Sequence, residues 1–105
     1  MIIQINTASS IKGSKDYEAK ISQLLEKEFA KYSTHITRIE VHLSDEDGSD
    51  KNGPNSRKCI LEARVEGKQP IAVTSYNDTN EKAVHGAIKK LNAALRPTLE
   101  QMKEH

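Results

Sequence analysis

Four basic residues in the C-terminal third of the chain are the strongest candidates for a functional site. They share one segment of helical periodicity and are Lys82, Lys89, Lys90 and Arg96. No acidic residue lies between Lys82 and Arg96, whereas acidic residues concentrate in residues 45–50 and 16–28. Such a local excess of positive charge is what a phosphate-binding surface needs. From the spacing alone, a nucleic-acid interface and an ordinary solvated lysine-rich helix face explain these residues equally well.

Residues that could support catalysis or bind a metal do not form recognisable sets. The glycine-rich phosphate loops and the G-x-S-x-G motif are missing from the sequence. Cys59 falls at an inward position of a predicted strand, where a free cysteine acts as a small core residue. The acidic residues 45–50 do not fit a calcium loop, because Asp50 stands where that loop needs glycine. We therefore expect a protein that is not an enzyme and that binds no cofactor, metal or small-molecule substrate.

The bulk composition favours one small folded domain. A chain of 105 residues has room for a single domain, and its 35% hydrophobic residues fall in periodic clusters. The formal net charge is only +1, so a basic face must be balanced by an acidic one elsewhere. No segment approaches the roughly 20 apolar residues of a membrane span, and the first ten residues lack the features of a signal peptide. A cytoplasmic monomer that does not bind membranes is expected.

Hydrophobic periodicity predicts an α+β fold with the order β-α-β-β-β-α. Alternation predicts strands over residues 1–6, 37–43, 57–66 and 69–76, and helical spacing predicts helices over residues 14–32 and 78–95. The strands should form a four-stranded sheet that contains an antiparallel meander, with both helices packed on one face. Asp78 or Thr79 is expected to cap the second helix, with Asp78 preferred because Glu81 follows it three residues later. Pro97 is expected to break or kink the helix near Leu95. Residues 1–96 then form the domain, and residues 97–105 form an extension of the helix or a flexible tail.

Five segments carry a recognisable family pattern: MIIQIN, FAKYSTHI, ITRIEVHLS, CILEARVEG and AVHGAIKKLNAAL. From Met1 to about Leu95 the chain resembles the ribosome hibernation-promoting factors and ribosome-associated translation inhibitors, also called ribosomal subunit interface proteins. The resemblance implies a protein that binds the small ribosomal subunit through basic side chains on rRNA phosphates and favours inactive ribosomes under stress. It also implies that Lys90 corresponds to the lysine of the family's Lys-Leu pair. Lys82, Lys89 and Arg96 lie on the same predicted helix.

Two other functions remain open at this point. The fold could serve a protein-binding stress module that no longer binds ribosomes, with the acidic loop 45–56 as the recognition element for a basic partner. A double-stranded RNA-binding domain has the overlapping order α-β-β-β-α and uses lysines at the start of its second helix. Here that start carries only Lys82, so this alternative is weaker.

Overall fold

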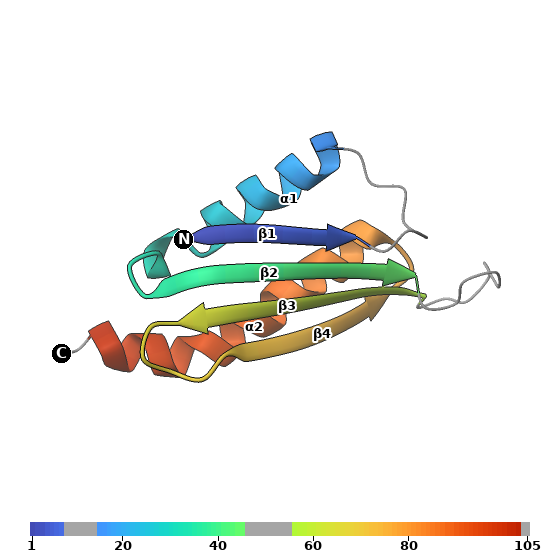
Figure 1. Ribbon diagram of the computed structural model, residues 1–105. Helices are drawn as coiled ribbons and strands as arrows, with labels where there is room; N and C mark the ends of the chain where they lie inside the picture. The colour runs from blue at the N-terminus through green and yellow to red at the C-terminus, as the bar shows by residue number, and fades with distance from the viewer. Residues whose placement is uncertain (8–14, 46–55, 104–105) are drawn as a thin grey trace.

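The chain folds into one four-stranded sheet and two long helices, in a computed structural model that describes residues 1–7, 15–45 and 56–103 (Figure 1). The elements along the chain are β1 (Ile2–Thr7), α1 (Lys15–Glu28), the 3-10 helix η1 (Ala30–Tyr32), β2 (Ile36–Asp45), β3 (Arg57–Val65), β4 (Ile71–Asn77) and α2 (Asn80–Lys103). This is the predicted order β-α-β-β-β-α, and the predicted α+β class is confirmed.

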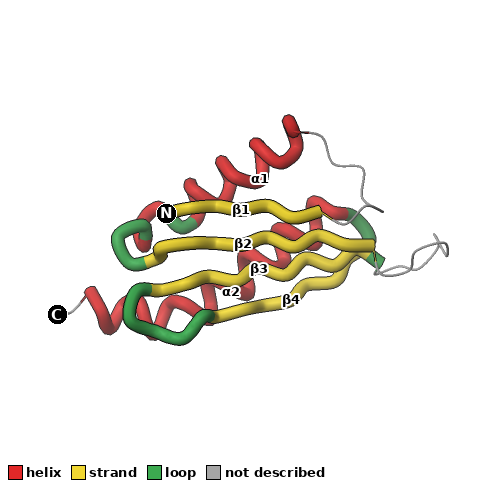
Figure 2. The backbone as a smooth tube through the Cα atoms, in the orientation of Figure 1, coloured by secondary structure: helices red, strands yellow, loops and turns green. Residues whose placement is uncertain are grey.

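The strands lie side by side in the order β1-β2-β3-β4. β1 runs parallel to β2, while β2, β3 and β4 form the predicted antiparallel meander. A parallel pair needs a crossover connection, which α1 provides between β1 and β2. In Figures 1 and 2, α2 crosses behind the sheet and α1 runs beside β1. Buried residues of both helices form one core cluster with the inward residues of the sheet, so one sheet face is covered and the other is open.

The core lies between the sheet and the two helices. Alternate residues of β2 and β3 point into it, among them Val41, Leu43, Leu61 and Ala63, all of which are buried. Each helix presents one apolar stripe to the sheet, since apolar residues recur at helical spacing in both. The largest buried helix residues are Ile21, Leu25, Val84, Ile88, Leu91, Leu95 and Leu99. Cys59 is buried in the same cluster, and burial raises the pKa of its thiol to about 12, so the predicted core role is confirmed.

The structure distinguishes between the alternatives predicted for the two ends of α2. The helix begins at Asn80, and the hydroxyl of Thr79 accepts a hydrogen bond from the backbone N–H of Lys82 at 3.1 Å. Of the two predicted candidates Thr79 is therefore the N-cap, because its side chain satisfies a free N–H of the first turn, and the preference for Asp78 is wrong. At the other end, where a break or a kink is predicted, Pro97 does not break the helix: α2 continues to Lys103, with Leu99 fully buried.

Gly86 of α2 lies against the side chain of Ser75 in β4. A Cβ atom added at Gly86 would overlap the hydroxyl oxygen of Ser75, which is itself buried. Since the glycine costs helix stability of about 1 kcal/mol relative to alanine, the close contact explains why a glycine stands here.

Replacing Gly86 by alanine is expected to lower the free energy of unfolding by about 1–2 kcal/mol, because overpacking against Ser75 outweighs the gain in helix propensity. The measurement is urea denaturation followed by far-UV circular dichroism. The same change in a Ser75→Ala background serves as the control, since the clashing oxygen is then gone. There Gly86→Ala should be neutral or stabilising, and an equal loss in both backgrounds would contradict the explanation.

Candidate nucleic-acid interface

Three of the four predicted basic residues lie on one face of α2. Lys82, Lys89 and Arg96 are each seven residues apart, which is close to two helical turns and spaces them by about 10.5 Å along the helix axis. All three side chains are exposed, on the opposite side of the helix from the buried Leu91. We call these three residues the α2 basic stripe. His85, also exposed, lies on the same face between Lys82 and Lys89.

Direct ion pairs leave most of the charge of the α2 basic stripe uncompensated. The ammonium of Lys82 lies 3.4 Å from the carboxylate of Asp78, one helical turn earlier, and both side chains are more than half exposed. An exposed pair of this kind is weak and screened by salt. Among the described residues, no carboxylate lies within 4.0 Å of the charged nitrogens of Lys89 or Arg96. Two full positive charges are thus available to a ligand.

Lys90 points in another direction. It lies about 100° around the helix from Lys89, and its ammonium donates a hydrogen bond to the backbone carbonyl of Thr74 in β4 at 2.7 Å. The structure therefore gathers three of the four predicted residues and places the fourth at the edge of the sheet. The sequence carries a signal for the grouping in the seven-residue spacing of Lys82, Lys89 and Arg96, but it carries none for the contact with Thr74.

A shallow hollow of about 500 Å³ lies beside the α2 basic stripe, between α2 and the end of α1. Its lining includes Lys89, Arg96, His85 and Asn92 from α2 and one acidic residue, Glu28, from α1. Two cations therefore face one carboxylate in this hollow. The amide of Asn92 adds hydrogen-bonding groups to a surface that already attracts anions, which suits the phosphate and ribose groups of a nucleic-acid backbone.

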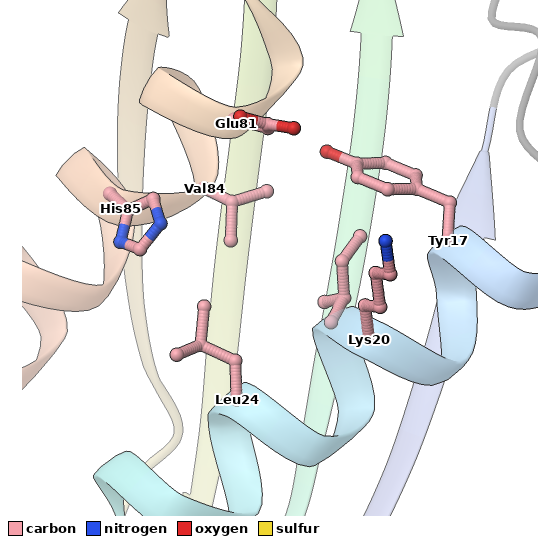
Figure 3. A pocket seen from close by; sticks show the side chains of 7 residues that line it. Tyr17, Lys20, Leu24, Glu81, Val84 and His85 are labelled. Atoms are coloured by element: carbon pink, nitrogen blue, oxygen red, sulfur yellow. The ribbon is translucent and has the colours of Figure 1, made fainter.

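A second hollow between the two helices is much smaller, with a volume of about 150 Å³ (Figure 3). Apolar side chains of Leu24 and Val84 line it, and the hydroxyl end of Tyr17 points toward Glu81. Burial raises the pKa of Tyr17, and the negative charge of Glu81 raises it further. Pockets for small ligands usually measure roughly 300–1,000 Å³, so this hollow gives no support for a small-molecule substrate.

The open face of the sheet also carries basic residues, but its charges compensate one another. The carboxylate of Glu40 lies 2.9 Å from Nε of Arg38 and 3.5 Å from nitrogens of Arg64 and His42, and Glu62 pairs with Arg64 at 3.5 Å. The hydrogen bond from Arg38 is the main reason why the pKa of Glu40 is lowered. A polyanion would have to compete with these carboxylates, so α2 is the better candidate for a phosphate-binding surface.

The predicted acidic loop 45–56 lies largely beyond the described residues, which leave out 46–55. At its base, Arg57 donates a hydrogen bond to Asp45 at 2.8 Å and links the facing ends of β2 and β3. Over the ranges that the structure describes, no group of three or more His, Cys, Asp or Glu side chains could hold a metal ion. No described helix is long and apolar enough to cross a membrane.

Comparisons with known proteins agree with this architecture. A ribosomal subunit interface protein from Coxiella burnetii superposes with a TM-score of 0.67 at 17% identity, covering 100% of both chains. The Protein Y N-terminal domain from Thermus thermophilus gives a TM-score of 0.72 at 12% identity over 93% of this chain and 99% of that one. At these identities the two structures support the fold alone.

A comparison of the sequence with curated proteins gives no match. The family model described as Sigma 54 modulation protein / S30EA ribosomal protein matches residues 10–103. This match covers most of the chain, agrees with the predicted family and supports a ribosome-associated role. The chain belongs to the Sigma 54 modulation protein / S30EA ribosomal protein family.

Proposed function

We propose that this protein binds rRNA of the small ribosomal subunit through the α2 basic stripe and favours inactive ribosomes under stress. It acts in the cytoplasm as a monomer, without catalysis and without a cofactor. The observation that carries the proposal is the exposed pair Lys89 and Arg96, which has no carboxylate partner among the described residues of a chain from a ribosome-associated family. Lys82 extends the surface by two further helical turns.

Phosphate binding is the chemistry that this surface supports best. Its three long side chains cover about 21 Å of the helix axis, so they can contact several phosphates of a folded RNA at once. Contacts to phosphates fix the position of a protein but read no sequence, which suits binding to the regular backbone of rRNA. Lys90 belongs to the predicted set as well, and we propose that it contributes least, because its ammonium already donates to Thr74.

Binding through phosphates should weaken steeply with salt. Two to three contacts predict a slope of about −2 to −3 in a plot of log affinity against log salt concentration. Raising the salt concentration fourfold should therefore reduce the affinity for purified small subunits by about 15- to 60-fold. The measurement is co-sedimentation of the protein with small subunits over a series of KCl concentrations. An affinity that does not change over the series would rule out binding through the α2 basic stripe.

A further inference from the structure

The outer edge of β4 lacks the charged strand residues that usually protect an exposed sheet edge. β4 is the last strand in the sheet order and pairs with β3 on one side only. Its seven residues, IAVTSYN, include no charged side chain. An edge strand with free backbone groups and no charge is a template for pairing with another strand, and proteins usually block such edges.

The register shows which residues present their backbone groups at this edge. Glu66 N donates to the carbonyl of His35, so even-numbered residues of β3 direct their backbone groups toward β2 and odd-numbered ones toward β4. The β4 residues that pair with these odd-numbered residues are Ile71, Val73, Ser75 and Asn77, and their backbone groups point toward β3. The residues between them, Ala72, Thr74 and Tyr76, therefore turn their N–H and C=O groups outward.

Lys90 occupies the middle of that edge. Thr74 is the central residue of β4, and its outward carbonyl accepts the 2.7 Å hydrogen bond from the ammonium of Lys90. A strand that paired with β4 would need this carbonyl and would displace the ammonium. The side chain of Lys90 would then have to leave this position, and its ammonium would lose the hydrogen bond that it makes now.

We propose that Lys90 closes the outer edge of β4 to strand addition by a second copy of this chain. The sequence of β4 suits such a pairing, because two antiparallel copies centred on Thr74 place no like charges opposite each other. Both helices lie on one face of the sheet, so the two-fold axis would bring two Lys90 ammonium groups together at the same carbonyls. Repulsion between these two groups keeps the copies apart.

This role does not depend on the proposed function. It concerns the isolated protein, and it separates Lys90 from its neighbour Lys89, which is exposed and makes no hydrogen bond or ion pair with the described residues.

Replacing Lys90 by methionine removes the ammonium and keeps an unbranched side chain. Lys89→Met is the matched control, because it causes the same loss of charge on the same helix. Sedimentation velocity of the free proteins over a concentration series should show a two-fold rise in mass for Lys90→Met and a monomer for Lys89→Met. Far-UV circular dichroism checks that both are folded. A Lys90→Met protein that stays monomeric at all concentrations would overturn the proposal.

A second change tests whether the new contact uses the edge of β4. Thr74→Pro removes the outward N–H, and this N–H takes no part in pairing with β3, so an edge strand tolerates the proline. The double variant Lys90→Met/Thr74→Pro, if folded by circular dichroism, should return to a monomer and support the proposal. A double variant that still doubles in mass would show that the copies meet elsewhere and would refute it.

Discussion

Reversing the charges of Lys89 and Arg96 together is expected to weaken binding to small ribosomal subunits by about 100-fold. Each side chain is proposed to make one charge-assisted contact with an rRNA phosphate, and such contacts contribute about 1.5 kcal/mol or more each. Two of them give about 3 kcal/mol, and every 1.4 kcal/mol corresponds to a factor of ten in affinity. The variant Lys89→Glu/Arg96→Glu, compared with the unchanged protein at one fixed salt concentration, measures this loss by co-sedimentation with purified small subunits.

The control for this experiment must separate the position of the charge from its amount. Lys27→Glu/Lys68→Glu changes two exposed lysines on α1 and on the turn before β4. Each reversal subtracts two charges, so both double variants change the formal net charge from +1 to −3. The control should keep most of the affinity. Equal losses in the two variants would mean that overall charge, and not the α2 basic stripe, governs binding.

Truncating Leu99 to alanine is expected to lower the free energy of unfolding by about 3 kcal/mol. Leu99 lies beyond Pro97 yet is fully buried, and a buried leucine replaced by alanine usually costs 2–5 kcal/mol. Small domains have total stabilities of only about 5–15 kcal/mol, so this loss would be conspicuous in urea denaturation. We propose on this ground that the folded domain extends to Lys103.

The exposed neighbour Gln101 provides the comparison for Leu99. Gln101→Ala lies on the same final turns of α2 and removes no buried contact, so its effect should stay within about 0.5 kcal/mol. If Leu99→Ala were as mild as Gln101→Ala, residues 97–103 would behave as a frayed tail and the domain would end near Arg96, as the sequence suggested.

Most of the fold could be predicted from the sequence because local pattern and tertiary structure agree. Ile39, Val41 and Leu43 alternate with polar residues, and the strand that contains them buries the predicted side. At Pro97 the sequence left a break, a kink and a helix extension open, because there the local pattern and the tertiary structure oppose each other. A proline inside a helix removes one backbone hydrogen bond and costs about 3 kcal/mol, but the burial of Leu99 further along α2 offsets much of that cost. The helix propensity of a segment does not reflect the contacts that its residues make with the rest of the domain.

The candidate site was predictable only in part. The lack of acidic residues between Lys82 and Arg96 identified the segment, and helical geometry alone places Lys82, Lys89 and Arg96 on one face. Adjacent lysines, by contrast, look equivalent in a sequence. Lys90 differs from Lys89 only because α2 crosses behind the sheet at a position where Lys90 reaches the edge of β4. That difference depends on tertiary structure.

The parallel pairing of β1 with β2 has a consequence for the order of events during synthesis. β1 emerges first, but its partner strand begins only at Ile36, after the whole of α1 and η1. The meander that follows can form from neighbouring segments, whereas β1 must wait for a distant one, and such long-range closure is slow. Until β2 has left the exit tunnel, the apolar side chains of Ile3 and Ile5 have no sheet to join, so the nascent β1 segment passes through a stage in which these side chains are exposed.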